Sequence, residues 1–227
     1  MKYNFIAIEG NIGAGKTTLA TKIAEHFDAK LVLEQFEENP FLPNFYKDAE
    51  KYSFPLELSF LAGRYQQLKD RLPNQDLFKS FTISDYLFDK SLIFAKINLP
   101  PDEFRLFSKL FTIINSNLPK PDLLVYLFLD VRSTQANIKI RGREYEQKIH
   151  DAYLEKVQNG YMEYFKHLSN QRILIMDING VDFVSDPSAY KGIIEALDKP
   201  YDQGITRLVF SEKRVHSGNQ PTFIHYY

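Results

Sequence analysis

Short apolar runs alternate along this chain with longer stretches in which apolar residues recur every three or four positions. The short runs predict buried strands, and the recurring spacing predicts helices with one apolar face. We expect five strands, at residues 4–9, 30–33, 81–85, 123–129 and 172–177. We expect helices around residues 43–50, 53–71, 88–97, 102–117, 133–142, 150–169 and 187–197.

This alternation of strands and helices predicts an α/β fold, in which a doubly wound parallel sheet of five strands is flanked by helices. The run at residues 123–129 is almost continuously apolar, as expected for a strand that is covered on both faces. Ligands bind such sheets at the carboxyl ends of the strands. Residues 9–15, Glu34 and Asp85 occupy those ends and are therefore the first candidates for a site.

The predicted elements all fall within residues 1–199, which we expect to form one domain. The segment Lys199-Pro-Tyr-Asp-Gln-Gly204 looks like a break after that domain. Residues 200–227 then form a C-terminal extension of unassigned role. Residues 205–210 have some strand-like character, but nothing in the extension indicates chemistry.

Composition narrows the classes of function. The chain of 227 residues is 44% hydrophobic and has a formal net charge of −1, so we do not expect nucleic acid as a partner. The absence of cysteine excludes disulfides, thiolate zinc sites and cysteine nucleophiles. No apolar run approaches the ~18 residues of a membrane span, and the first expected strand leaves no room for a targeting peptide. We therefore expect a cytoplasmic protein that does not bind a membrane.

Residues 10–17 carry the spacing G-x-x-x-x-G-K-[ST] of a phosphate-binding loop. Glycines let successive backbone N–H groups face phosphate oxygens, Lys16 can reach the β- and γ-phosphates, and Thr17 can bind Mg²⁺. The loop joins an expected strand to the N-terminus of a helix, which favours anions. The sequence thus predicts an ATP site formed by Gly10, Asn11, Ile12, Gly13, Ala14, Gly15, Lys16, Thr17 and Thr18.

A phosphate-transferring enzyme also needs cations that close over the phosphates and a carboxylate for the acceptor. Arg141 and Arg143 flank a glycine just after an expected helix, and guanidinium groups bind phosphate oxygens in bidentate fashion. Glu34 ends the second expected strand, beside the phosphate loop, where it suits a catalytic base. Asp85 ends the third strand and can hold Mg²⁺ through water, while Thr17 binds the ion directly.

Four stretches occur in a consistent order along residues 3–197. They are Ile8-Glu-Gly-Asn-Ile-Gly-Ala-Gly-Lys-Thr17, Glu38-Asn-Pro-Phe-Leu with Phe45-Tyr46, Tyr52-Ser-Phe-Pro-Leu-Glu57 with Arg64, and Arg141-Gly-Arg143 with Glu146. In these stretches the chain resembles the deoxyribonucleoside kinase family, most closely its short bacterial deoxyadenosine/deoxyguanosine kinase branch. The phosphate loop alone would also fit thymidylate and shikimate kinases, whereas the ordered set does not.

The resemblance implies a role for each matching residue. Glu34 would accept the proton of the sugar 5′-hydroxyl, with Glu37 or Glu38 as the next candidates, although we expect both of these to be solvated. Arg141 and Arg143 would contact the transferred phosphoryl group. The nucleoside would be bound by Tyr46 and Glu146 at the 3′-hydroxyl, by Glu57 and Arg64 at the base, and by Phe54 as a wall of the base pocket. The resemblance also implies a homodimer.

Three positions depart from the pattern of the family. Tyr86 stands where an arginine usually follows the acidic residue of strand three. Asn137 replaces an arginine one helical turn before Arg141 and Arg143, the two arginines of the lid that closes over the phosphates. Gln35 stands where a proline usually follows the catalytic glutamate. Losing two arginines removes positive charge where phosphate charge accumulates, which puts the catalytic rate in question. Lys90 is the cation that can compensate for Tyr86.

Glu57 predicts the preferred base, because relatives usually have glutamine at this position. An ionised carboxylate only accepts hydrogen bonds, whereas an amide also donates. Guanine presents two adjacent donors to such a group, while adenine and cytosine each present a donor beside an acceptor. We therefore predict a preference for deoxyguanosine, with Arg64, seven residues along the same helical face, as the partner of Glu57.

The sequence thus predicts an ATP- and Mg²⁺-dependent kinase of nucleotide salvage that phosphorylates the 5′-hydroxyl of a 2′-deoxyribonucleoside, preferably a purine. One alternative is a nucleoside monophosphate kinase of the thymidylate type, which would need further cations to hold the phosphate of its acceptor. The other is a nucleotide-binding regulator without turnover, which Tyr86 and Asn137 favour and which Glu34 and Lys16 oppose.

Overall fold

The computed structural model describes residues 1–35, 39–72, 79–116, 118–210 and 224–226. Glu37 and Glu38, which the sequence predicts to be solvated, lie outside these ranges. Among the helices that the structure describes, none is long and apolar enough to cross a membrane.

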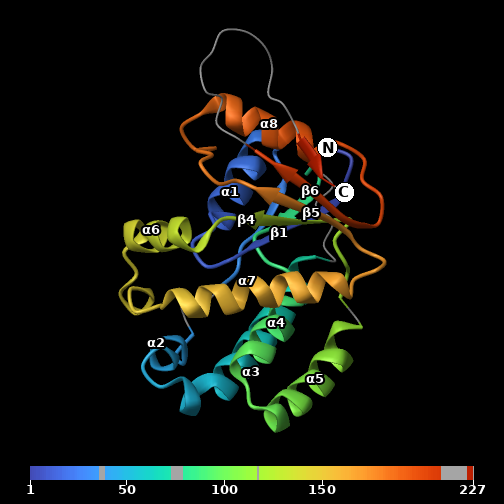
Figure 1. The fold of residues 1–227 in the computed structure, drawn as a ribbon. Helices are drawn as coiled ribbons and strands as arrows, with labels where there is room; N and C mark the ends of the chain where they lie inside the picture. Colours follow the sequence, from blue (N-terminus) through green and yellow to red (C-terminus); the bar gives the residue numbers. More distant parts are fainter. Residues whose placement is uncertain (36–38, 73–78, 117, 211–223, 227) are drawn as a thin grey trace.

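One sheet runs through the middle of the molecule, in the order β2-β3-β1-β4-β5-β6-β7 (Figure 1). The strands are β1 (Phe5–Gly10), β2 (Lys30–Val32), β3 (Thr82–Ser84), β4 (Leu123–Phe128), β5 (Arg172–Asp177), β6 (Gly204–Val209) and β7 (Ile224–Tyr226). All pairs from β2 to β6 are parallel, and β7 is antiparallel to β6. Strand β1 lies between β3 and β4, where the order of the strands reverses. A crevice at the carboxyl edge is expected at this point.

The predicted α/β fold with a doubly wound parallel sheet is confirmed, and all five predicted strands are present. The sheet extends further than predicted, because the C-terminal segment adds the parallel strand β6 and the antiparallel strand β7. Only Leu208 of β6 is buried, while Ile205 is 47% exposed. A strand with so little burial gives a weak hydrophobic signal, so the sequence indicated it only faintly.

Helices cover both faces of this sheet (Figure 1). They are α1 (Lys16–Phe27), α2 (Leu42–Phe45), α3 (Ala49–Arg71), α4 (Lys90–Asn98), α5 (Pro101–Asn115), α6 (Val131–Arg141), α7 (Asp151–Lys166) and α8 (Pro187–Leu197), with a 3₁₀ turn η1 (Glu144–Glu146) between α6 and α7. Helices α1 and α8 pack on one face of the sheet and α7 packs on the other. Helices α3, α4 and α5 form a further apolar cluster beyond α7.

Strand β4 shows how its sequence fits between the two layers. Leu123, Val125 and Leu127 belong to the cluster under α1 and α8, whereas Leu124 and Tyr126 pack toward α7. All five side chains are buried, which explains why this strand is almost continuously apolar rather than alternating.

Helix α3 begins earlier than the sequence pattern predicts. Its N-cap is Asp48, whose carboxylate accepts the backbone N–H of Lys51 at 3.2 Å. The cap satisfies a free N–H of the first turn and so extends the helix toward the N-terminus. The predicted helix at residues 43–50 is therefore replaced by the short α2 and the first turn of α3.

Candidate active site

The phosphate loop joins β1 to α1 at the central crevice of the sheet. Gly13 and Gly15 have φ of 82° and 86°, a left-handed conformation that glycine adopts without strain. A Cβ on Gly13 would also lie 2.7 Å from the carbonyl oxygen of Thr134. The ammonium group of Lys16 donates to the carbonyls of Gly10 and Asn11 at 3.0 and 2.9 Å. Burial and the nearby charge of Lys90 lower the pKa of Lys16 to about 8.

Two hollows meet beside this loop. The outer cleft, about 1200 Å³, runs along the phosphate loop to α6 and the segment before α8. The inner cavity, about 120 Å³, lies among α2, α3, α4 and the start of α7. Among the described residues, the side chains that line both hollows are Lys16, Thr17, Glu34, Asp85, Arg141 and Arg143. These six residues mark the junction of the two hollows.

The predicted ATP-site residues divide between the two hollows and the core. Residues 13–18 line the outer cleft, and Ile12 lines the inner cavity. Gly10 and Asn11 are not among the described residues that line either hollow. Asn11 is buried instead, and its side-chain amide donates to the carbonyl of Leu154 at 2.9 Å. This contact ties the phosphate loop to α7.

Hydrogen bonds connect Thr17, Asp85 and Glu34 at the junction. The Thr17 hydroxyl donates to Asp85 Oδ2 at 2.5 Å, and the backbone N–H of Glu34 donates to Asp85 Oδ1 at 2.7 Å. Asp85 thus links the start of α1 to the segment that follows β2. The sequence predicted Thr17 and Asp85 as a joint metal site, and the structure places their oxygens together.

Glu34 is held by cations on two different helices. Arg64 of α3 contacts Oε1 through Nε and Nη2, at 2.8 and 2.7 Å, and Lys90 of α4 contacts Oε2 at 2.6 Å. Burial raises the pKa of Glu34, but Lys90 and Arg64 together outweigh burial and lower that pKa to about 2. The carboxylate is therefore ionised at neutral pH. Lys90, the predicted compensating cation, pairs with Glu34.

The lid segment brings its two arginines to one acid. Arg141 ends α6 and forms an ion pair with Glu146 of η1, and Arg143 Nη1 lies 3.5 Å from the same carboxylate. Tyr46, which follows α2, stacks on Tyr145 with the ring centroids 6.0 Å apart. Figure 1 shows α2 on the same side of the molecule as the turn from α6 to α7. Tyr46, Glu146 and both arginines line the inner cavity.

Glu57 points into the inner cavity but does not pair with Arg64 as predicted. Asn98 Nδ2 of α4 donates to Glu57 Oε1 at 2.8 Å. Oε2 is buried and has no hydrogen-bond partner among the described residues. Burial raises the pKa of Glu57 to about 7. The predicted pairing is wrong because the guanidinium of Arg64 is already engaged by Glu34 and, at 2.7 Å, by the hydroxyl of Ser91.

The predicted aromatic wall also needs correction. Phe54 packs into the apolar cluster of α3, α4 and α5 and is absent from the described lining of the inner cavity. Phe60 lines the cavity instead and contacts the guanidinium of Arg64, 4.7 Å from ring centroid to Cζ. Positions 57, 60 and 64 recur at helical spacing, so this signal was available in the sequence. Further lining residues that the sequence analysis missed are Leu42, Phe45, Leu56, Phe94, Asn98 and Tyr153.

The two departures at the phosphate end have structural roles here. Tyr86 is fully buried, and its hydroxyl donates to Gln67 Oε1 at 2.9 Å. Asn137 lines the outer cleft, and its Nδ2 donates to the carbonyl of Gly13 at 2.8 Å. Tyr86 therefore faces the core, whereas Asn137 supports the phosphate loop.

A phosphate loop at the switch point of a parallel sheet, with a second cavity and a buried carboxylate beside it, defines a P-loop phosphotransferase. The model of the deoxynucleoside kinase family matches residues 6–200. The chain belongs to the deoxynucleoside kinase family, as its ordered motifs predict.

Relatives of known activity and solved structures agree with this assignment. The chain is 36% identical over 193 residues to a deoxyguanosine kinase of Bacillus subtilis, covering 83% of this chain and 93% of the relative. It is 28% identical to a deoxyadenosine kinase of Lactobacillus acidophilus, covering 86% and 94%. Among solved structures, deoxyadenosine kinase from M. mycoides with bound dATP superposes with a TM-score of 0.74 at 26% identity, covering 86% of this chain and all of the other.

Proposed function

We propose that this protein transfers the γ-phosphoryl group of ATP to the 5′-hydroxyl of a purine 2′-deoxyribonucleoside in nucleotide salvage. The observation that carries the proposal is the junction of the two hollows. A triphosphate in the outer cleft places its γ-phosphate at the six junction residues. A nucleoside in the inner cavity places its 5′-hydroxyl at the same point. Donor and acceptor thus meet among two acids, three cations and a threonine.

In the proposed reaction, the 5′-oxygen attacks the γ-phosphorus and the bond from that phosphorus to the β–γ bridging oxygen breaks. The products are ADP and the nucleoside 5′-monophosphate, and the proton of the hydroxyl passes to Glu34. Lys16, Arg141 and Arg143 stabilise the charge on the transferred group. Positioning and electrostatics carry most of the catalysis in such transfers, because their transition states are loose.

Glu34 retains a hydrogen-bonding position for the 5′-hydroxyl. A carboxylate offers about four lone-pair positions. Oε1 receives two N–H bonds from Arg64, whereas Oε2 receives one bond from Lys90. Oε2 therefore has a position left for the 5′-hydroxyl, and the two cations fix the orientation of the carboxylate.

The oxygens of Thr17 and Asp85 suit Mg²⁺, which prefers oxygen ligands and takes one or two from the protein beside substrate phosphates. The ion would be held by these two residues, and its chemistry would be to neutralise charge on the phosphates. The remaining positive charge comes from the chain itself, through Lys16 and the lid arginines.

Replacing Glu34 by glutamine tests the role of the base. We expect kcat to fall by ~10²-fold or more, the usual effect of losing a general base, while the affinity for ATP changes little. ATP consumption is measured with the four deoxynucleosides and, separately, with their monophosphates. The variant Glu50→Gln, at an exposed position in the first turn of α3, is the matched control.

Each outcome of this assay separates the candidate functions. Turnover of nucleosides that Glu34→Gln lowers by ~10²-fold or more supports the proposal. Turnover of monophosphates alone would indicate a thymidylate-type kinase, and ATP binding without any turnover would indicate a regulator. A kcat within a few-fold of wild type would show that Glu34 is not the base.

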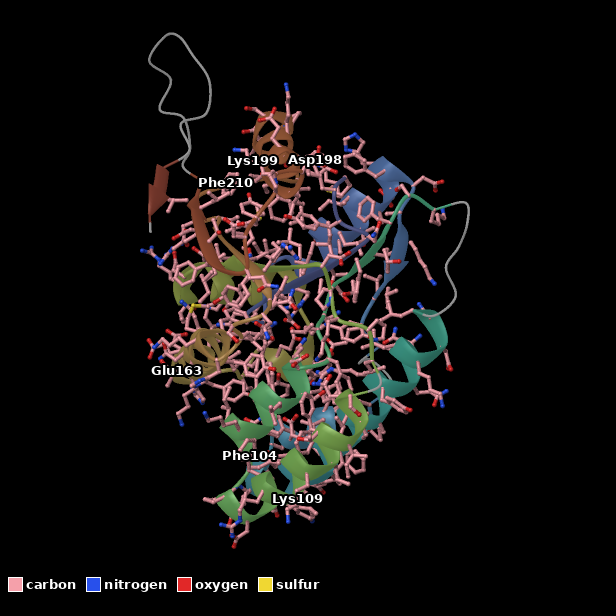
Figure 2. All side chains as sticks on the ribbon, turned by 90° about the vertical axis from the view of Figure 1, so that its right-hand side faces the viewer. Phe104, Lys109, Glu163, Asp198, Lys199 and Phe210 are labelled. Atoms are coloured by element: carbon pink, nitrogen blue, oxygen red, sulfur yellow. The ribbon has the colours of Figure 1, made fainter. Side chains whose placement is uncertain are left out.

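The proposed assembly is a homodimer, supported by an exposed apolar stripe on α5. Leu106, Leu110 and Ile113 are 52%, 36% and 68% exposed and recur at helical spacing. Figure 2 shows α5, marked by Phe104 and Lys109, at the end of the molecule opposite Lys199 and Phe210. A dimer through this stripe would leave the phosphate loop uncovered, because α5 is absent from the described linings of both hollows.

A further inference from the structure

The inner cavity contains one polar group that the protein leaves unsatisfied. Glu57 is 1% exposed, and its Oε2 is buried without a hydrogen-bond partner among the described residues. A buried polar atom without a partner is strongly unfavourable, so native proteins rarely contain one unless a ligand or water completes it. Because Glu57 lines the inner cavity, a molecule bound there lies beside this carboxyl group.

Asn98 determines which oxygen of Glu57 remains available. Its Nδ2 donates to Oε1 at 2.8 Å, so Oε1 acts as an acceptor in either protonation state. A proton on the carboxyl therefore resides on Oε2. Oε2 accepts a hydrogen bond when Glu57 is ionised and donates one when Glu57 is protonated.

Adenine and guanine differ at ring position N1 in whether they donate or accept a hydrogen bond. N1 of guanine carries a hydrogen and donates, whereas N1 of adenine is an acceptor. An ionised Oε2 is complementary to guanine N1–H and faces a lone pair in adenine. A protonated Oε2 is complementary to adenine N1 and faces an N–H in guanine.

We infer that Glu57 and Asn98 form a base-reading pair, in which Asn98 fixes the Glu57 carboxyl and the proton on Oε2 decides between adenine and guanine. This inference rests on the proposed function, which places the nucleoside in the inner cavity. Asn98 is a positioning residue, because it acts through Glu57. The pair makes base selection depend on pH.

Several groups set the pH at which Glu57 changes its charge. Burial raises the pKa of Glu57 to about 7, against the hydrogen bond from Asn98 and the charges of Arg64 and Lys90, which lower it. The groups that act on Glu57 are Arg64 on α3, Lys90 and Asn98 on α4, Tyr153 on α7 and Glu34 after β2. The change therefore falls near neutral pH, where both protonation states are populated.

The test is a competition between deoxyguanosine and deoxyadenosine for the full-length protein, with ATP and Mg²⁺, between about pH 6 and about pH 8. The measured quantity is the ratio of the two kcat/KM values. Both nucleosides compete for the same enzyme, so the titration of shared catalytic groups cancels from the ratio. We expect the preference for deoxyguanosine over deoxyadenosine to rise about tenfold across this range, the factor for one unmet buried hydrogen-bond group.

Two variants, one at each residue of the pair, test whether Glu57 and Asn98 cause the pH dependence. In Glu57→Gln the amide donates where Oε2 lay, so the ratio should move toward deoxyadenosine and become independent of pH. In Asn98→Leu the hydrogen bond that lowers the pKa of Glu57 is lost, so the midpoint of the change should move to higher pH. Damage to the fold alone would lower both kcat/KM values without moving that midpoint. Glu50→Gln should behave as wild type.

A wild-type ratio that does not change with pH would overturn the inference, and this measurement needs no variant. If no nucleoside is phosphorylated at all, the proposed function fails instead. The base-reading pair is then tested by calorimetric binding of the two nucleosides at both pH values. A rising affinity ratio supports the pair, and a constant one rejects it.

Discussion

At the scale of single residues, the site depends on which acid each cation contacts. Arg64 and Lys90 both bind Glu34 and fix its carboxylate, while Glu57 Oε2 has no hydrogen-bond partner among the described residues. Tyr86 is a second residue whose role depends on its contacts. Its ring is fully buried and its hydroxyl bonds to Gln67, so it packs in the core and is absent from the described linings of both hollows.

The buried position of Tyr86 changes what an arginine at this position is expected to do. From sequence alone, Tyr86→Arg should raise the rate or leave it near neutral. In this packing it would bury a further cation beside Glu34 and Asp85, which already have partners, and we expect it to destabilise the protein by roughly 3 kcal/mol or more. Denaturant unfolding of Tyr86→Arg, with Tyr86→Phe as the milder control, measures this loss. Wild-type stability together with a higher kcat would contradict the buried placement.

At the scale of elements, β6 shows that the C-terminal segment is part of the sheet. It pairs in parallel with β5 over its whole length, and Leu208 joins the core under α1 and α8. Arg207 also forms an ion pair with Asp177 of β5 at 2.9 Å. The match to the family ends at residue 200, so this strand lies beyond the part of the chain that the family model describes.

Removing β6 should therefore weaken the whole fold. We expect a chain that ends at residue 203 to melt at a temperature lower by on the order of 10 °C, because a buried leucine and a full parallel pairing are lost. A chain that ends at residue 210 keeps β6 and lacks only residues 211–227, so it is the matched control. Thermal unfolding by circular dichroism compares the three lengths. Equal melting temperatures would show that β6 adds nothing to stability.

At the scale of the whole molecule, the proposed homodimer concerns the exposed face of α5. Helix α5 lies at the end of the molecule opposite Lys199 and Phe210, and its exposed stripe consists of Leu106, Leu110 and Ile113 (Figure 2). Scattered exposed apolar residues are ordinary on soluble proteins, whereas a continuous stripe on one helix face is typical of an interface.

A charge in this stripe tests the assembly. We expect wild-type protein to sediment as a dimer and Leu110→Glu to sediment as a monomer, because a buried unpaired carboxylate at an interface is strongly unfavourable. Thr112→Glu introduces the same charge at an exposed position of α5 outside the stripe and should remain dimeric. Unchanged sedimentation of Leu110→Glu would place the interface elsewhere or exclude it.

The sequence by itself determined the fold class, the phosphate loop and the residues that meet at the junction. These features are local: glycine spacing, the length of apolar runs and the position of a carboxylate at a strand end are all visible along the chain. Because parallel strands share one carboxyl edge, the ends of β1, β2 and β3 had to meet once the alternation was recognised. Glu34 and Asp85 follow from that rule.

Only the tertiary structure decided the partners of the buried charges. Glu57 and Asn98 are separated by 41 residues, and their contact depends on how α3 and α4 pack against each other. The choice of Arg64 between Glu34 and Glu57 is equally a matter of packing, since both acids are within reach on sequence grounds. Likewise Phe54 and Phe60 differ only in the face of α3 that each occupies. A sequence pattern gives the period of a helix, but the neighbouring elements determine which of its faces becomes the site.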